Sequence, residues 1–152
     1  MALFTPEGLV SFEIHHLDDE EPLPATGRYS VSSKRAPSIA ERDRLAAVRV
    51  RTDEELGREL VDAPAVLFVM DALTDGRVFS QAHVLRARLQ YQGPVWISGP
   101  MIPDQMGMAL RCGVDGVEVP DDVDPEPWTR AARRFRHCYQ TAIRQPRARA
   151  ID

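Results

Sequence analysis

The chain has little of what marks several large classes of protein. Its 152 residues include two cysteines, Cys112 and Cys138, which are too few for a disulfide-rich secreted scaffold. No apolar run approaches the about 18 residues that a membrane span requires, and the first residues lack the basic-then-apolar order of a signal peptide. We therefore expect one soluble, cytoplasmic protein, large enough to fold without a metal or a disulfide.

Motifs for cofactors are missing as well. The sequence contains no Cys-x-x-Cys pair, no P-loop and no Gly-x-Gly-x-x-Gly fingerprint. His15 and His16 are adjacent on an alternating segment, so they point to opposite faces and cannot share a metal there. His83 and His137 fall on different expected helices. We therefore predict no cofactor and no metal, and the sequence leaves open whether the chain is an enzyme.

Charge is unevenly distributed along the chain, although the net charge is only −4. Residues 1–76 are acidic overall, and residues 130–149 contain seven arginines and no acid. On a helix, one outer face would carry four arginines that could contact a partner, namely Arg130, Arg133, Arg134 and Arg144. Because the whole chain is acidic, we expect this face to be solvated or to dock an acidic partner rather than to bind nucleic acid.

From about residue 44 onward the hydrophobic pattern is regular. It predicts strands at 45–50, 65–70, 95–98 and 116–119, and helices at 53–61, 77–90, 104–112 and 128–142. Strands that alternate with helices pair in parallel, because each helix is a crossover between them. The predicted fold class is therefore α/β, with a four-stranded, mostly parallel sheet and flanking helices. Periodicity does not separate a doubly wound sheet from half of a β/α barrel.

The front of the chain lacks this regularity. Residues 10–16 alternate well enough for a short strand, whereas residues 17–38 are dense in proline, glycine, serine and charge, as loops are. We therefore divide the chain into an irregular N-terminal segment at 1–43, an α/β domain at 44–145 and a frayed tail at 146–152.

A ligand site is expected beyond the carboxyl ends of the strands, where parallel α/β sheets bind their ligands. Segments 71–77 and 98–105 leave that edge and lead into helix N-termini, which attract anions. The candidate ligand-binding residues in or beside these segments are Asp75, Gly76, Arg77, Ser80, Asp104 and Gln105. Among them, Arg77 offers a forked donor suited to carboxylate, phosphate or sulfur oxyanions.

A structural interpretation of the same residues competes with this one. Asp75 and Gly76 form a common turn pair, and Arg77 has an acid, Asp71, close by in the sequence. Asp104 suits the start of a helix, and it would repel an anion unless Arg77 neutralised it. The sequence alone does not decide between a ligand site and a set of structural contacts.

An ordered pattern between residues 75 and 119 resembles that of a known family. An Asp-Gly-Arg turn precedes a helix with a Ser and a Leu-Arg pair, and an Asp-Gln pair and Arg-x-Gly-x-Asp follow before a last short strand with a Glu. The matching positions are Asp75, Gly76, Arg77, Ser80, Leu85, Arg86, Asp104, Gln105, Arg111, Gly113, Asp115 and Glu118. In these positions the chain is similar to a divergent member of the uncharacterised bacterial family labelled "probable oxidoreductase involved in sulfite reduction".

The resemblance implies an accessory or interaction protein associated with assimilatory sulfite reduction, whose partner is sulfite reductase or another redox protein. Since the sequence has no redox motif, that partner would carry the cofactor. Two alternatives stay open: a small oxyanion- or phosphate-binding domain or enzyme that uses Arg77, and a structural subunit of a larger assembly or homo-oligomer.

Overall fold

The computed structural model describes residues 1–39 and 42–134. One sheet of eight strands runs through it, in the order β2-β1-β8-β7-β6-β5-β4-β3. The strands are β1 (Ala2–Thr5), β2 (Gly8–Ser11), β3 (Ile14–His16), β4 (Arg28–Ser32), β5 (Leu45–Arg51), β6 (Val66–Val69), β7 (Val95–Ser98) and β8 (Gly116–Val119). Strands β3 to β8 are parallel, and β1 and β2 form an antiparallel hairpin beside β8.

The α/β class is confirmed, and the four strands expected after residue 44 are present as β5 to β8. The helices of the described chain are α1 (Arg77–Ala87), α2 (Met106–Arg111), α3 (Pro125–Arg133) and the 3-10 helices η1 (Ala36–Ser38), η2 (Arg58–Asp62) and η3 (Pro103–Gln105). The helix expected at 53–61 is reduced to η2, because Gly57 has an extended backbone and interrupts it. None of the described helices has the length and apolar character needed to cross a bilayer.

The predicted number of strands is wrong, and the first 43 residues are irregular only in part. They supply β1 to β4, which flank the central strands on both sides. Two of these strands, β2 and β3, are largely exposed, so they lack the buried apolar run that marks a central strand. The predicted strand at 10–16 is split into β2 and β3. The end of the predicted helix at 128–142, Arg144 and the predicted tail at 146–152 lie outside the described residues.

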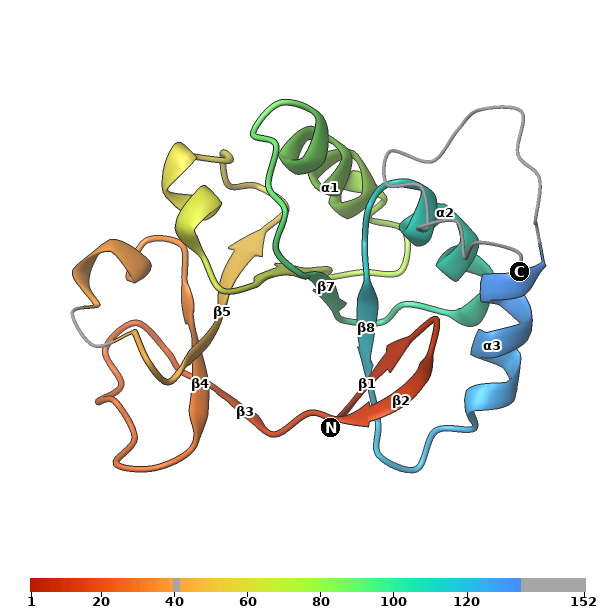
Figure 1. Ribbon diagram of the computed structural model, residues 1–152, viewed down its shortest axis with the longest axis horizontal. Coiled ribbons are helices and arrows are strands. Elements are labelled where there is room, and N and C mark those ends of the chain that lie inside the picture. The colour runs from red at the N-terminus through yellow and green to blue at the C-terminus, as the bar shows by residue number, and fades with distance from the viewer. Residues whose placement is uncertain (40–41, 135–152) are drawn as a thin grey trace, which may run out of the picture.

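The sheet curls into a half-barrel (Figure 1). Strands β2 and β3 stand at opposite ends of the strand order, yet only Phe12 and Glu13 separate them along the chain. Because consecutive Cα atoms are about 3.8 Å apart, so short a link brings the two ends of the sheet close together. Of the two predicted arrangements, the half-barrel is therefore the one that forms.

The two faces of the curled sheet bury different side chains. The outer face packs against the helices through a large core that includes Phe4, Phe68, Leu85 and Met106, all fully buried. The inner face holds a small cluster of Ala47, Ala65 and Leu67 against Trp96, and the ring of Phe12 meets Trp96 edge-on at 4.9 Å. Side chains thus occupy both faces, and the loops at the strand ends are left to form the functional surface.

Candidate functional site

The structure brings the two predicted loops together at one rim of the sheet. Segments 71–77 and 98–105 follow the neighbouring strands β6 and β7. The side chain of Gln105 donates from Nε2 to the carbonyl oxygen of Leu73 at 3.2 Å, and its Oε1 accepts from the backbone N–H of Ile102 at 3.3 Å. One glutamine therefore fixes both loops, and we call this edge the carboxyl rim.

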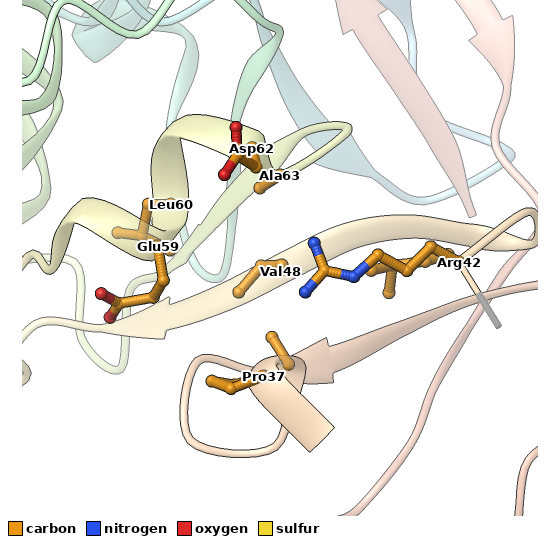
Figure 2. A pocket seen from close by; sticks show the side chains of 9 residues that line it. Pro37, Arg42, Val48, Glu59, Leu60, Asp62 and Ala63 are labelled. Carbon is orange, nitrogen blue, oxygen red and sulfur yellow. The ribbon is translucent and has the colours of Figure 1, made fainter. Parts of the chain in front are cut away.

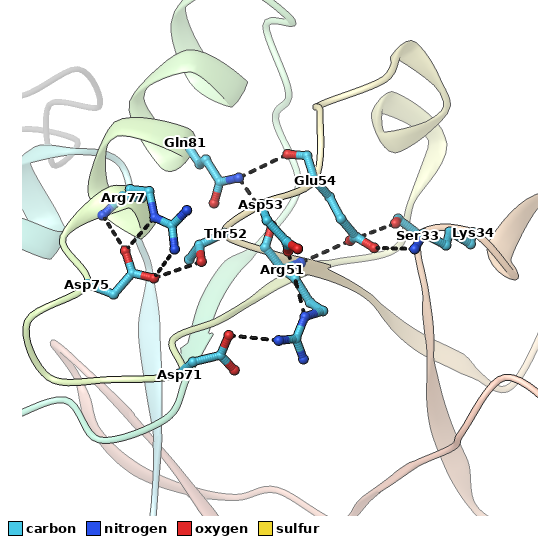
Figure 3. A network of polar contacts seen from close by, with 10 residues as sticks. All are labelled: Ser33, Lys34, Arg51, Thr52, Asp53, Glu54, Asp71, Asp75, Arg77 and Gln81. Atoms are coloured by element: carbon cyan, nitrogen blue, oxygen red, sulfur yellow. Dashed lines mark hydrogen bonds and ion pairs between the residues drawn. The ribbon is translucent and has the colours of Figure 1, made fainter.

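Arg77 is held at this rim by Asp75 (Figure 3). Its Nε and Nη2 donate to the two carboxylate oxygens of Asp75, each at 2.8 Å, and Thr52 Oγ1 donates to Asp75 at 2.7 Å. The hydrogen bonds from Arg77, and then that from Thr52, hold the pKa of Asp75 well below its usual value. The pKa of Arg77 is raised in turn, chiefly by its hydrogen bond with Asp75. The guanidinium fork that could receive an oxyanion already binds a carboxylate.

Neighbouring charges at the rim are paired in the same way (Figure 3). Arg51, at the end of β5, donates from Nη2 to Asp71 at 2.8 Å, so Asp71 is not the partner of Arg77. Glu54 accepts hydrogen bonds from Ser33 Oγ and from the backbone N–H of Arg51. Gln81 of α1 donates to the carbonyl oxygens of Arg51 and Glu54. These contacts tie the ends of β4, β5 and β6 to α1.

The other candidate ligand residues lie on two elements, at the start of α1 and in η3. Gly76 is the N-cap residue of α1, and Ser80 is exposed on its first turn. Asp104 lies in η3, 3.8 Å from Arg134 of the chain after α3. Within residues 1–39 and 42–134, no hydrogen bond or ion pair joins Arg77 to Asp104. The oxyanion site at Arg77 stays a prediction, and a ligand there would compete with Asp75.

Three arginines of the expected interaction face are described. Arg130 lies 3.6 Å from Glu126, one turn earlier in α3, and Arg134 is the partner of Asp104. Arg133 is exposed and forms no ion pair with the rest of the described chain. The face is therefore less basic than its sequence indicates, because acids of the same chain neutralise part of it.

The two rim loops and the helix that follows them carry three exposed apolar side chains. Leu73 is 42% exposed, Ile102 41% and Met108 51%. Gln105 binds the main chain of Leu73 and Ile102, and Met108 follows Gln105 by three residues along η3 and α2, about one helical turn. We call these three side chains, with the Asp104–Arg134 pair, the carboxyl-rim patch. Apolar groups exposed beside polar ones are typical of protein interaction sites.

A second polar group lies on the inner face of the half-barrel, away from the predicted ligand site. His16 Nδ1 is 2.7 Å from Ser30 Oγ, and His16 Nε2 is 2.9 Å from Glu118 Oε1. Burial raises the pKa of Glu118, but hydrogen bonds from His16 and Ser98 and the nearby positive charges outweigh it, so this pKa lies below its usual value. His16 thus links the edge strand β3 to β8 across the concave face.

The Ser-His-Glu order resembles that of a hydrolase triad, but its surroundings do not suit catalysis. Ser30 is fully buried, so its hydroxyl cannot reach a substrate carbonyl. The group therefore acts as a structural clasp. Alternation places His16 and Ile14 on one face of β3, but nothing local in the sequence shows that His16 meets a residue 102 positions away.

Three residues of the family-like pattern meet in a buried contact behind α1. Arg86 donates from Nη2 to Asp115 at 2.6 Å and from Nε to the carbonyl oxygen of Gly113 at 3.0 Å. Asp115 also accepts from the backbone N–H of Val95 at the start of β7. This part of the pattern serves packing, because it anchors α1 to β7 and β8.

A small pocket lies away from the carboxyl rim, beside β5 (Figure 2). Its volume is about 170 Å³, and it is lined by Ala36, Pro37, Arg42, Leu45, Val48, Glu59, Leu60, Asp62 and Ala63. Ordinary ligand pockets have about 300 to 1,000 Å³. Its charged residues have both signs, so it favours no single class of charged ligand.

Among the described residues, Cys112 is the one cysteine, and His, Cys, Asp and Glu side chains are the potential metal ligands. No group of three or more His, Cys, Asp or Glu side chains in this part of the chain is arranged to hold a metal ion. Cys112 is free and partly buried, and burial raises the pKa of its thiol, which lowers its reactivity.

The sequence matches a bacterial protein family of unknown function, DUF934, over residues 47–149. The chain belongs to this family. No curated protein matches the chain, and no solved structure does. The DUF934 match covers most of β5, all of β6 to β8 and the three α-helices of the described chain, whereas β1 to β4 precede it. The carboxyl-rim patch therefore lies wholly within the DUF934 region, while the clasp joins that region to His16 outside it.

Proposed function

We propose that this DUF934 protein is an accessory protein that docks onto a partner protein through the carboxyl-rim patch. The observation that carries the proposal is that Gln105 joins the main chains of two loops in which Leu73 and Ile102 are exposed, with exposed Met108 on the helix that follows. Burying exposed apolar surface of this kind is a main source of affinity between proteins.

The charges around the patch favour docking over catalysis. Arg77 is bonded to Asp75, Arg51 to Asp71, and Arg134 lies beside Asp104. A catalytic acid or base must reach the substrate to exchange a proton with it. Charges that are already paired within the chain are less available to act as a catalytic acid or base. Such an ion pair can also be buried in an interface without leaving an unpaired charge desolvated.

The partner that we propose is a redox protein of sulfite reduction, with sulfite reductase as the first candidate. The support is the resemblance of residues 75–119 to proteins labelled with that process. The partner would hold the redox centre, since the sequence has no cofactor motif of its own. A stable complex of this kind would also make the chain a structural subunit of a larger assembly.

Binding of the full chain to purified sulfite reductase from the same bacterium tests the proposal. Isothermal titration calorimetry should show a complex, and Ile102→Asp should raise its Kd at least about tenfold, which corresponds to about 1.4 kcal/mol. The physical reason is that the new carboxylate would be desolvated in the interface without a partner. Met108→Asp should have a similar effect.

Val61→Asp is the matched control. Val61 is 44% exposed, as the patch residues are, but it lies in η2 before the start of β6, away from the carboxyl rim. This variant should leave the Kd unchanged. The absence of any complex, or an equal loss of affinity in the control, would contradict the proposal.

A further inference from the structure

Acidic residues are concentrated at the carboxyl rim. The six residues that follow each of the parallel strands β3 to β8 contain 13 of the chain's 23 acids, but only two of its 19 lysines and arginines. At the opposite rim, the six residues before each of β4 to β8 contain four acids and three bases. The fold thus gathers at one rim acids that are scattered along the sequence.

Part of this acidity is neutralised within the chain. Arg51, Arg77 and Arg134 form ion pairs with four of the rim acids. Lys34 lies 3.7 Å from Glu54, and the amino group of Met1 lies 2.8 Å from Asp121. Seven rim acids are exposed and have no ion pair in the described part of the chain, namely the four at 18–21 with Glu55, Asp122 and Asp124.

The acidic run at 18–21 is held mainly through its main chain. Arg35 donates to the carbonyl oxygens of Asp18 and Glu21 at 2.5 Å and 2.6 Å, and Arg49 donates to the carbonyl oxygen of Leu17. All four acids of the run are exposed. With Arg35 and Arg49 counted, this part of the rim still carries more negative than positive charge.

The carboxyl-rim patch lies between acidic segments. In the strand order, the loops after β6 and β7 stand between the segments that follow β5 and β8. The two loops carry Leu73 and Ile102, whereas the flanking segments carry Glu55 on one side and Asp122 and Asp124 on the other. Exposed apolar side chains therefore have unpaired acids on both sides of them along the rim.

The curl of the sheet brings the run at 18–21 to the same end of the molecule. His16, the last residue of β3, lies 2.9 Å from Glu118 near the end of β8. The segment at 17–22 therefore leaves the rim beside the segment that follows β8. Acids thus extend around the rim from the loop after β5 through that after β8 to that after β3.

The spread of these acids suits a protein better than an ion. In residues 1–39 and 42–134, no three His, Cys, Asp or Glu side chains are arranged to hold a metal ion. The apolar patch among the acids is an independent sign of a macromolecular partner, since a free ion gains nothing from Leu73 or Ile102. Nucleic acid would be repelled by the same charges.

We propose that the partner of the carboxyl-rim patch is a protein that presents lysine and arginine side chains around an apolar centre. The inference rests on the proposed function and adds the charge of the partner to it. Complementary charges raise the rate of encounter and orient the two proteins before the apolar surfaces meet. The sequence alone predicts an acidic partner, for the arginine face of the chain; the carboxyl rim fits a partner of the opposite charge.

The salt dependence of association with purified sulfite reductase tests the proposal. Between about 0.01 M and 0.15 M salt the Debye length falls from about 30 Å to about 8 Å, so the association rate constant should fall at least about tenfold. Stopped-flow mixing measures it. A rate constant that does not change with salt would show that charge has no part in docking, and one that rises with salt would indicate an acidic partner; either result overturns the proposal.

Neutralising acids of the rim locates the effect. The triple variant Glu20→Gln, Glu55→Gln and Asp122→Asn removes one charge from each of three segments, and none of these side chains has a hydrogen bond or ion pair in the described chain. At about 0.1 M salt the Debye length is about 10 Å, so distant charges are largely screened. Association of this variant should be at least about threefold slower, with little change in dissociation, because exposed charges act mainly on the encounter.

Glu7→Gln, Glu59→Gln and Asp62→Asn together are the matched control. They remove the same number of charges from exposed acids that lie outside the rim segments, in the turn after β1 and in η2. This variant should associate within about 1.5-fold of the wild-type rate. Equal slowing in the two variants would mean that net charge, and not the rim, governs association, and it would overturn the proposal. Circular dichroism checks that both variants are folded.

Two further outcomes separate this inference from its alternatives. No complex at any salt concentration would contradict the docking function itself, on which the inference rests, whereas a complex that is insensitive to salt contradicts only the charge of the partner. Sedimentation equilibrium of the chain alone tests a second copy as the occupant of the rim. A dimer that dissociates as salt is raised would assign the rim to another copy of this chain and overturn the proposal.

Discussion

Single residues at the carboxyl rim find their ionic partners within the chain. Arg77 binds an acid two positions before it, and Arg51 binds Asp71 on the neighbouring strand's loop. Ion pairs of this kind neutralise charges that, judged from the sequence alone, would be available to a ligand. The exposed apolar side chains Leu73 and Ile102 differ from these charges, because they remain in contact with water. Transferring apolar surface from water into an interface is favourable, so these two side chains gain from burial against a partner.

Glu118 gives a pH-dependent prediction at this scale. Its folded pKa is below the usual value, so its contribution to stability is present above the pKa of the unfolded chain, about 4.3. That contribution is lost as the pH falls through the folded pKa. The free energy of unfolding should therefore fall more steeply below about pH 4.3 for the wild type than for Glu118→Gln.

Urea unfolding between pH 7 and pH 3 measures both proteins. At pH 7, Glu118→Gln should be less stable by about 1 to 3 kcal/mol, because it loses hydrogen bonds to a charged group. Parallel pH profiles for the two proteins would show that the clasp with His16 has no role in acid unfolding.

At the scale of elements, the turn after β7 depends on Gly99. Its φ is +129°, and a Cβ there would lie 2.1 Å from the carbonyl oxygen of Met70, just after β6. Because this atom belongs to the main chain of the neighbouring strand, it cannot move aside cheaply. Gly99→Ala should lower the free energy of unfolding by at least about 2 kcal/mol, from backbone strain and the clash together.

Gly8 is a matched control for this prediction. It has nearly the same φ, +127°, but nothing lies within 4 Å of an added Cβ. Gly8→Ala should therefore show the backbone strain alone, at about 1 kcal/mol. Chemical denaturation of both variants measures the difference, and an equal or greater loss for Gly8→Ala would refute the role of the close approach to Met70.

At the scale of the whole molecule, strands that precede the DUF934 region cover both edges of its part of the sheet. The match begins at residue 47, inside β5, while β4 and β1 pair with the outer edges of β5 and β8. A fragment of residues 47–152 would expose both edges at once. We expect it to aggregate when expressed, since unpaired parallel strands recruit other chains.

Size-exclusion chromatography compares the aggregation of the fragment with that of the full chain, and urea unfolding compares their cooperativity. Co-expression with residues 1–46 should restore part of the soluble material, because that segment carries the missing strands. A fragment that stays in solution and unfolds cooperatively would show that the DUF934 region is independent of β1 to β4.

The sequence by itself determined the central strands, the places of α1 and α2 and the common rim of the two loops. Strands β7 and β8 lie where their residues predict, because each carries its apolar pattern locally, and parallel pairing then sends segments 71–77 and 98–105 from the same edge. Only the tertiary structure decided the curl, the places of β1 to β4 and the choice of ionic partners. The physical reason is the separation of the contacts along the chain. Hydrophobic periodicity is a property of about ten neighbouring residues. The pairing of β1 with β8 and the contact of His16 with Glu118 join segments about a hundred residues apart, so no local pattern predicts them.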